Sequence, residues 1–538
     1  MHTLNFENFN FPNRRSNIIA ENGLVATSQP LAAQAGLDVL KAGGNAVDAA
    51  IATVATLCVV EPCSTGIGGD AFALIWQADE KKLYGINASG PAPMGLTADF
   101  VRRQGHKTFP PLGPLAVTVP GSLRGWELAL NRFGSMGLDT LLKRPFQYAQ
   151  NGFPVSETIA RQWQRSQDKM SVHPDSKRVW VPGGKTPRVG ERFQNPEFAQ
   201  TLATLANNGY DTFYRGDIGR QITAAVQAAG GVLTEDDLAN YEAEWVDPIS
   251  AEYGDGFTFY EIPPNGQGLT ALIALNIAAG FDLPSLGYGT ADYYHALIEV
   301  MKLAFADAHA YIADPRQADI PLAALLSQPY ADQRRGLINM TSAQQLTPGK
   351  PLELGDTTYL TVADGNGNMV SWIQSLYMGF GSGLTAGTTG IQLQNRGANF
   401  SLEPGHPNEA APGKRPYHTI IPGFITRHGD AWSSFGVMGG FMQPQGHLQV
   451  GLNLVEFGMD PQTALDAPRF NWLEDKRVAV ETAVSAKIRH ELAQRGHELP
   501  TPDTPIHYGG GQVIVRLPET GMLIGGSEPR NDGCAVGW

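Results

Sequence analysis

A run of apolar residues at 49–60 constrains the fold of this chain more than any other feature of the sequence. The run follows Asn45 and ends before Pro62, and its apolar residues occupy every side of a helix rather than one stripe. Protein must cover such a helix all round, because the run is too short to cross a bilayer. The sequence therefore predicts a buried helix within a large core.

The segments on either side of this run predict a packed unit of helix and sheet. Ser28-Gln29-Pro30 is a helix-start signal, and the helix expected at 31–42 ends at a glycine pair. After the buried helix, the turn Thr65-Gly66-Ile67-Gly68-Gly69-Asp70 leads into two strand-like runs, at 71–76 and 83–87. The first part of the chain thus combines two helices with the start of a sheet.

The pattern of expected secondary structure changes at Thr357. Before it, helical spacing dominates, and the polar 152–193 segment, rich in Arg and Pro, is expected at the surface. After it, strand patterns dominate, which predicts a mixed α/β (α+β) protein. The remaining expected helices are 122–132, 195–208, 217–229, 269–279, 291–313, 445–457 and 486–495, and the remaining expected strands are 357–363, 369–377, 419–426, 432–438, 512–516 and 522–524.

Composition and charge narrow the functional classes. With 538 residues, 42% of them hydrophobic, the chain can build more core than one ordinary domain. Its 39 basic and 52 acidic side chains give a net charge of -13, which opposes binding to nucleic acid. Neither a signal peptide nor a membrane span is visible, so a cytoplasmic protein without a membrane partner is expected. Cys58, Cys63 and Cys534 show no metal spacing and suit free thiols better than a disulfide framework.

Several short motifs resemble known sites but lack essential parts. The glycine turn at 66–69 precedes a strand and has no GK[ST] ending, so it is interpreted as a tight turn. Asp364-Gly365-Asn366-Gly367-Asn368 lacks the glycine and the closing glutamate of a calcium loop and is interpreted as a hairpin turn. The SxxK match at 166–169 has no SDN partner, His490 and His497 are too far apart for HExxH, and GxSxG is absent. No metal or cofactor is therefore expected.

The stretch Gly355-Asp356-Thr357-Thr358-Tyr359 places Asp-Thr-Thr at the start of an expected strand. A purely structural interpretation suffices for it alone, because Gly-Asp favours a turn and β-branched Thr favours a strand. Together with other blocks, however, the stretch resembles the gamma-glutamyltranspeptidase family of N-terminal nucleophile hydrolases. The resemblance covers nearly the whole chain in the family's order, and its most specific part is LKAGGNAVDAA at 40–50 combined with the Asp-Thr-Thr junction. The other blocks are ENGLVAT at 21–27, GIGGD at 66–70, DGNGN at 364–368, PGKRP at 412–416 and MGG at 438–440.

The resemblance implies a four-layer αββα sandwich and cleavage of the chain between Asp356 and Thr357. In the precursor, the Thr357 hydroxyl would attack the Asp356 carbonyl, and water would hydrolyse the resulting ester. The freed α-amine, with an ordinary pKa of about 7.7–8.0, can then act as the base for the Thr357 hydroxyl. The expected partners are a large fragment, 1–356, and a small fragment, 357–538, packed as one intertwined unit, with a dimer of these heterodimers as one assembly to test.

The family's supporting residues are carried over by position. Ser375 matches a second hydroxyl that hydrogen-bonds the nucleophile, and Gly439 and Gly440 match the pair whose backbone N–H groups stabilise the oxyanion. One such donor typically contributes about 3 kcal/mol in the transition state. Taken alone, Ser375 is equally consistent with an ordinary strand serine, and the glycine pair with a plain turn.

The expected substrate pocket departs from that of true transpeptidases. The arginine of their R-E-x-A-P stretch is missing at 88–93, and the residues that hold the substrate α-ammonium are replaced by Tyr377, Arg396 and Asn399. A buried ammonium needs an acceptor, and a nearby cation opposes it. We therefore expect an anionic acyl group without an amino group, its carboxylate bound by Arg396 in a bidentate pair. The alternative for Arg396 is a solvated ion pair at the surface.

These departures resemble a divergent branch of cephalosporin (glutaryl) acylase-like and oxamate amidohydrolase-like proteins. The segments HTIIP at 418–422 and MQPQGH at 442–447 are similar to sequences of that branch. His418 and Thr419 are therefore further candidates for substrate binding. The expected function is Thr-dependent hydrolysis of a small anionic amide, either oxamate to oxalate and ammonia or a glutaryl-type amide. Gamma-glutamyl transfer or glutathione hydrolysis is one alternative, and a non-catalytic scaffold of the same fold is another.

Overall fold

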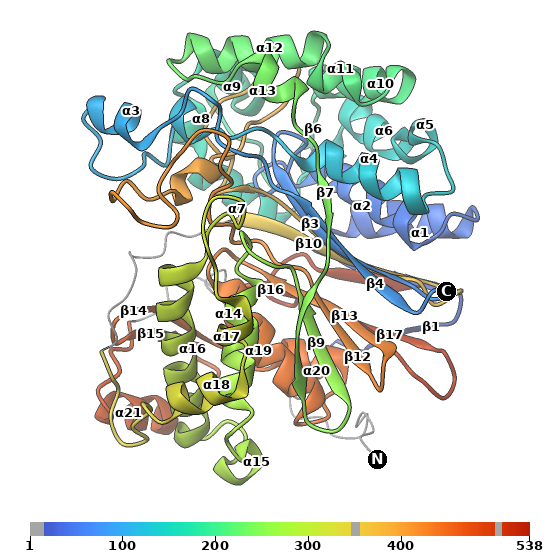
Figure 1. The fold of residues 1–538 in the computed structure, drawn as a ribbon. Coiled ribbons are helices and arrows are strands. Elements are labelled where there is room, and N and C mark those ends of the chain that lie inside the picture. Colours follow the sequence, from blue (N-terminus) through green and yellow to red (C-terminus); the bar gives the residue numbers. More distant parts are fainter. Residues whose placement is uncertain (1–14, 346–355, 501–507) are drawn as a thin grey trace.

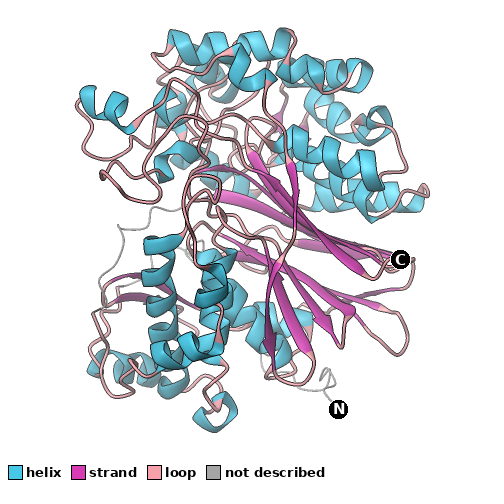
Figure 2. Ribbon diagram, in the orientation of Figure 1, coloured by secondary structure: helices cyan, strands magenta, loops and turns pink. Residues whose placement is uncertain are grey.

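Two antiparallel seven-stranded sheets lie face to face at the centre of the computed structural model, and helices cover both outer faces (Figures 1 and 2). The structure describes residues 15–345, 356–500 and 508–538. This arrangement confirms the expected four-layer αββα sandwich. In spatial order, the first sheet consists of β18 (Cys534–Gly537), β2 (Gly23–Thr27), β10 (Asp356–Asp364), β11 (Met369–Tyr377), β3 (Asp70–Gln77), β4 (Lys82–Ala88) and β7 (Glu244–Val246), and the second of β1 (Ile18–Ala20), β17 (Leu523–Ser527), β16 (Gly510–Arg516), β13 (Asp430–Met438), β12 (Gly423–Arg427), β9 (Phe257–Glu261) and β8 (Ile249–Tyr253).

Three apolar cores fill the spaces between the four layers. One lies between the first sheet and its helices, one between the second sheet and its helices, and one between the two sheets. The helices on the side of the first sheet are α1 (Pro30–Lys41), α2 (Ala46–Val60), α4 (Ser122–Phe133), α5 (Leu138–Leu141), α6 (Lys143–Asn151), α7 (Glu157–Arg165), α8 (Gln167–Met170), α9 (Pro174–Trp180), α10 (Pro196–Asn208), α11 (Asp211–Tyr214), α12 (Asp217–Ala228) and α13 (Glu235–Ala239). The peripheral helix α3 (Ala98–Arg103) packs in a smaller apolar cluster with residues of the 400–410 segment. Those beside the second sheet are α14 (Gly268–Ala278), α15 (Leu283–Leu286), α16 (Ala291–Tyr311), α17 (Leu322–Leu325), α18 (Gln328–Arg335), α19 (Met442–Val455), α20 (Pro461–Asp466) and α21 (Ala486–Gln494).

The helix α2 is the buried helix that the sequence predicted, and all of its residues are buried. Side chains hold its first turn. Asn45 caps the helix, and the Asp48 carboxylate accepts hydrogen bonds from the backbone N–H groups of Asn45 at 3.0 Å, Ser135 at 2.9 Å and Met136 at 3.1 Å. The block at 40–50 is therefore a helix start that also fixes the loop after α4.

Replacing Asp48 by alanine is expected to lower the free energy of unfolding by about 2–4 kcal/mol, because buried N–H groups lose their acceptor. A lower urea midpoint with unchanged turnover of the folded protein would agree with this structural role. Asp38→Ala is the control, because the Asp38 ion pair with Arg144 is half-exposed and should contribute little. An unchanged midpoint for Asp48→Ala would contradict the expectation.

Most of the expected helices and strands are confirmed with small shifts at their ends, and two expectations are wrong. The strand expected from Thr419 begins only at Gly423, because the N–H groups ahead of it bind other segments: His418 donates to Asn265 and Ile421 to the Gln443 side chain. The 152–193 segment is not confined to the surface. It contributes Trp163, Trp180 and Phe193 to the first core, where their rings pack together.

The hairpin of β10 and β11 carries the expected cleavage junction at one end and the expected turn at the other. The turn is confirmed, because one Asp364 carboxylate oxygen accepts the N–H groups of Asn366 and Asn368, each at 3.0 Å. The other oxygen accepts the N–H of Ala46 at 3.0 Å. Two of the blocks that carry the resemblance are thus in contact, and the start of α2 anchors the far end of the hairpin.

Strands from both sides of the Asp356–Thr357 bond take part in both sheets. β10 pairs with β2 on one edge, and β11 pairs with β3 on the other. In the second sheet, β12 pairs with β9 in the same way. Fragments 1–356 and 357–538 would therefore be intertwined if the bond were cleaved. None of the helices in the described ranges combines the length and hydropathy needed to cross a membrane.

Candidate active site

Thr357 and Ser375 lie beside each other at the open end of the hairpin. Their hydroxyl oxygens are 3.2 Å apart, and both residues are buried. The backbone N–H of Tyr377 donates to the Ser375 hydroxyl at 2.7 Å, which fixes that oxygen next to Thr357. The pair is thus preorganised by the backbone, as a nucleophile and its hydrogen-bonding partner would need to be.

A β-bulge shapes this end of the hairpin. The register shifts between Asp356 and Thr358, so that β11 has one extra residue opposite Thr357. Across the next pair of strands, Ser375 is opposite Asp70 at the start of β3. Gly69 allows this approach, because a Cβ at Gly69 would lie only 2.3 Å from the Ser375 carbonyl oxygen. The glycine turn at 66–69 therefore makes room for the backbone of the site.

Contacts between the two sheets bring the end of β13 to the same side as Thr357. Thr361 hydrogen-bonds Ser434, and the Tyr359 ring packs against Gly436. Residue numbers rise along β10 as they fall along β13, and alternate residues of a strand share a face. Thr357 is therefore directed toward the end of β13, where Gly439 and Gly440 follow.

The backbone of the glycine pair suits an exposed N–H. Gly439 and Gly440 have φ angles of 129° and 62°, which favour glycine. The Gly439 carbonyl accepts the N–H of Met442 at 3.1 Å in the first turn of α19. Since the N–H of Gly440 lies on the opposite side of the same planar peptide, it points away from that helix. The geometry is compatible with an oxyanion donor.

Gln267, just before α14, fixes the carbonyl side of this pair, and it was not among the residues predicted from the sequence. Its side-chain amide donates to the Gly440 carbonyl at 2.9 Å and also to the Thr419 carbonyl. Its backbone N–H donates to the His418 carbonyl at 3.0 Å, and its side-chain oxygen accepts the Tyr417 hydroxyl at 3.0 Å. One buried glutamine thus joins the 417–419 segment to the glycine pair.

Arg396 is buried behind the hairpin, so the alternative of a solvated surface ion pair is wrong. Its exposed fraction is 0%, its guanidinium carbon lies 4.3 Å from the centre of the Tyr377 ring, and one N–H group donates to the Thr419 hydroxyl at 2.7 Å. The Nε and Nη2 groups have no hydrogen-bond partner among the residues that the structure describes. Burial lowers the pKa of Arg396 to about 10, opposed by attraction to Asp70, so the side chain is cationic at neutral pH.

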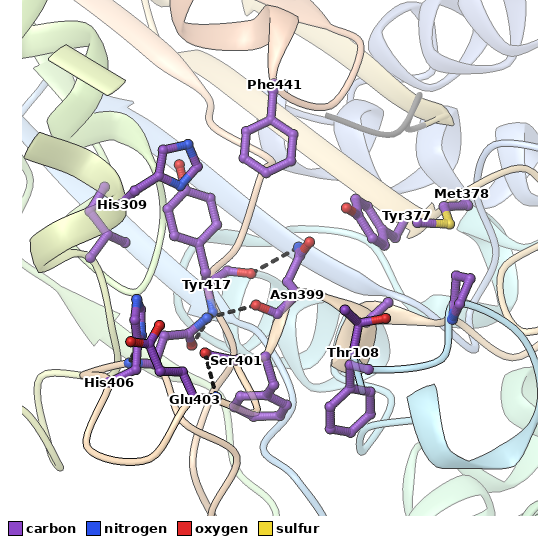
Figure 3. A pocket seen from close by; sticks show the side chains of 16 residues that line it. Thr108, His309, Tyr377, Met378, Asn399, Ser401, Glu403, His406, Tyr417 and Phe441 are labelled. Carbon is purple, nitrogen blue, oxygen red and sulfur yellow. Dashed lines mark hydrogen bonds between the residues drawn. The ribbon is translucent and has the colours of Figure 1, made fainter. Parts of the chain in front are cut away.

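A cavity of about 560 Å³ lies next to Tyr377, and Figure 3 shows the side chains around it. Tyr377 and Met378 form one side, while His309, His406 and Glu403 lie on the opposite side. The wall includes the aromatic rings of Phe109, Phe400, Tyr417 and Phe441. Phe441 directly follows the glycine pair, and Tyr377 ends the strand of Ser375, so the cavity adjoins the Thr357 end of the hairpin.

The expected substrate-binding residues fall into two groups. Tyr377 and Asn399 line the cavity, although the Asn399 side-chain N–H already donates to the Tyr417 carbonyl at 3.0 Å. Arg396, His418 and Thr419 are completely buried and are not among the residues that line it. Tyr377 connects the groups, because its ring both faces the cavity and contacts Arg396.

A separate buried cluster of His295, Glu299 and His497 contains three side chains of the types that bind metal ions. The two imidazoles hydrogen-bond each other at 2.8 Å, closer than the roughly 3.3 Å that two nitrogens need on one tetrahedral zinc ion. Lys302 already neutralises Glu299 at 2.7 Å. The cluster is therefore interpreted as a polar network, which binds the backbone of Asn339 through His295 and leaves Nδ1 of His497 without a partner among the described residues.

Comparison with known proteins places the chain in a family. The family model described as Gamma-glutamyltranspeptidase matches residues 32–538. The chain belongs to the gamma-glutamyltranspeptidase family. The glutathione hydrolase-like YwrD proenzyme of Bacillus subtilis (strain 168) is 37% identical, with 97% of this chain and 99% of that protein covered. The oxamate amidohydrolase proenzyme of Klebsiella pneumoniae is 33% identical, with 97% of this chain and 100% of that protein covered.

A solved structure has the same fold throughout. The crystal structure of cephalosporin acylase from Bacillus halodurans superposes with a TM-score of 0.93 at 48% sequence identity, and 99% of each chain is covered. These relatives have hydrolase, amidohydrolase and acylase names, and the present chain is an enzyme of their family.

Asp70 is the second site residue that the sequence did not identify. It lies within the GIGGD block of the gamma-glutamyltranspeptidase resemblance, yet nothing in the sequence indicates a buried charge beside Arg396. Its carboxylate accepts N–H groups from four separate segments. For Gln267 the available signal was weaker, namely a glutamine between two glycines in a loop.

Proposed function

We propose that this enzyme is an autoprocessing N-terminal nucleophile amidohydrolase, which cleaves amides of anionic acyl groups that lack an α-ammonium. The observation that carries the acyl preference is Arg396, a buried cation with two N–H groups that no described residue accepts. Because a buried donor without an acceptor is costly, a ligand carboxylate is a physically reasonable partner. The Tyr377 ring, which lines the cavity, contacts the Arg396 guanidinium.

The maturation step follows from the position of Thr357. In the precursor, the Thr357 hydroxyl attacks the Asp356 carbonyl carbon, the C–N bond breaks, and an ester forms as the nitrogen gains a proton. Water then hydrolyses the ester, which restores the hydroxyl and frees the Thr357 amine and the Asp356 carboxyl group. The proposal divides the chain into 1–356 and 357–538. The proenzyme names of the relatives support it.

Turnover then uses the same residue twice. The free amine takes the proton of the Thr357 hydroxyl, whose oxygen attacks the substrate carbonyl to give a tetrahedral oxyanion. The N–H groups of Gly439 and Gly440 bind the oxyanion, and Ser375 keeps the nucleophile in place through the 3.2 Å contact. The amine product leaves with a proton, and water releases the acid from the Thr357 ester.

The size of the cavity favours a glutaryl-type amide over oxamate. About 560 Å³ is in the range of sites for drug-sized ligands, and oxamate would fill only a small part of it. The aromatic wall also suits a cyclic or planar amine portion better than ammonia. The 48% identity to the solved cephalosporin acylase supports the same choice.

Three matched anilides test the proposal on the processed enzyme. Glutaryl p-nitroanilide differs from the γ-glutamyl compound only by the missing amino group and from the butyryl compound only by its carboxylate. We expect kcat/KM for the glutaryl compound to exceed both others by at least about 30-fold, the effect of roughly 2 kcal/mol. Preference for the γ-glutamyl compound would overturn the proposal in favour of transpeptidation, and no amide turnover by processed protein, oxamate included, would favour the scaffold.

A further inference from the structure

Asp70 is a completely buried carboxylate held by four N–H groups from four parts of the chain. One oxygen accepts the backbone N–H groups of Gly90 at 3.0 Å and Gly121 at 3.2 Å, together with the Gln394 side chain at 3.0 Å. The other oxygen is 3.1 Å from Nε2 of His418. The backbone of Asp70 is opposite Ser375 in the sheet. Such a carboxylate has a fixed position and cannot turn toward solvent.

The charged and titratable groups around Asp70 leave Arg396 as its counter-charge. His418 faces it from the 417–422 segment, Arg396 from the short helix η3 (Arg396–Asn399), and Tyr214 and Tyr241 from the first helical layer. Burial and the charges of Arg396 and Arg415 hold the pKa of His418 well below its usual range, and burial raises the pKa of both tyrosines. All three rings are therefore neutral near pH 7. Arg415 is paired with Glu244, so Asp70 and Arg396 remain as the two opposite charges of the free site.

We infer that Asp70 is a positioning residue that determines when the site accepts a carboxylate. It balances the charge of Arg396 in the free enzyme and takes up one proton when the substrate carboxylate binds. The inference rests on the proposed function, since it requires that carboxylate to bind near Arg396. A second unprotonated carboxylate near a single buried cation would leave a net negative charge among completely buried residues, and this is costly.

The titration of Asp70 supports this role. Burial raises the pKa of Asp70, and the positive charge of Arg396 and the hydrogen bonds act in the opposite direction. The net result is a pKa of about 7. An arriving anion would raise the pKa further, because it disfavours the charged form. Below about pH 7 Asp70 is already protonated and binding needs no proton. Above this pH each pH unit weakens carboxylate binding by up to about tenfold, the limit for one coupled proton.

The test measures glutarate binding to the processed wild-type enzyme between pH 6 and pH 9. Calorimetry at pH 8 in two buffers of different ionisation enthalpy should show uptake of close to one proton per glutarate. The KM of glutaryl p-nitroanilide should rise up to about tenfold per pH unit above about pH 7, while the KM of the butyryl compound stays constant. These measurements need no variant, so they do not depend on the folding of one.

Asp70→Asn provides the second test. The amide keeps an acceptor for Gly90, Gly121 and Gln394. Nε2 of the neutral His418 ring can accept the amide N–H in the other tautomer, which gives up the 3.4 Å bond from the Ile420 N–H to Nδ1. We expect a KM for the glutaryl compound that is independent of pH and at least about tenfold below wild type at pH 8.5. Asp48→Asn, a buried carboxylate outside the site, should lower stability and keep the wild-type pH profile.

The outcomes separate this inference from the proposed function. If the wild type prefers the glutaryl compound but binds glutarate without proton uptake, the role of Asp70 is overturned and the proposed function stands. The same holds if Asp70→Asn keeps the wild-type pH dependence of KM. If the wild type shows no preference for a carboxylate at any pH, the proposed function fails first, and the inference falls with it.

Discussion

Replacing Thr357 by alanine is expected to leave the enzyme as one polypeptide of 57.8 kDa and to abolish its amidase activity. Without the hydroxyl, neither the attack on the Asp356 carbonyl nor formation of the acyl-enzyme can occur. Loss of a nucleophile that acts together with its base lowers kcat on the order of 10⁵-fold or more. Denaturing gel electrophoresis reports the cleavage, and anilide hydrolysis reports the turnover.

Thr357→Ser is the matched control, because it keeps the hydroxyl and loses only the methyl group. It should still be cleaved, although more slowly, and it should retain measurable turnover. Co-expression of 1–356 with 357–538 starting at alanine would separate the two roles, since this pair needs no cleavage and should nevertheless be inactive. Activity in that pair, or in uncleaved Thr357→Ala, would refute Thr357 as the nucleophile.

Replacing Arg396 by methionine is expected to lower kcat/KM for glutaryl p-nitroanilide at least about 30-fold, since losing a buried charge pair costs about 2–5 kcal/mol. The rate with the butyryl compound should change little, because that substrate has no carboxylate. Lysine at this position should restore only part of the rate, since its ammonium cannot present the two N–H groups of a guanidinium side by side. Steady-state kinetics with both substrates make the comparison.

The buried Arg469 offers a matched control for the loss of a buried arginine. It lies 3.0 Å from Glu528 and donates to the Tyr508 carbonyl at 3.0 Å, outside the candidate site. Arg469→Met should lower the unfolding midpoint without altering the ratio of glutaryl to butyryl rates. If Arg396→Met lowers both rates equally, Arg396 has a structural role and does not recognise the acyl group.

The local sequence was sufficient for much of the fold. An apolar run without a polar side could only be a buried helix, and α2 is buried along its whole length. Alternation and turn residues located the β10–β11 hairpin, because Asp364 makes its turn with its own neighbours. The short strands β7, β8 and β9 were missed. β7 and β8 are edge strands, whereas β9 lies between β12 and β8. Pairing of β7 with β4, of β9 with β12 and of β8 with β9 stabilises these strands of mixed composition.

For the site, the sequence by itself determined which chemical groups are available: a threonine at a strand start, a serine on the next strand, a glycine pair, an added arginine, and an asparagine in place of an acid. These follow from residue type and order, and they needed the resemblance to be noticed. Only the tertiary structure decided that Arg396 is buried with two N–H groups that no described residue accepts, that Asp70 is its counter-charge, and that Gln267 joins the glycine pair to the 417–419 segment. Those contacts join residues far apart in the chain, and burial, which sets their electrostatic strength, exists only once both sheets have packed.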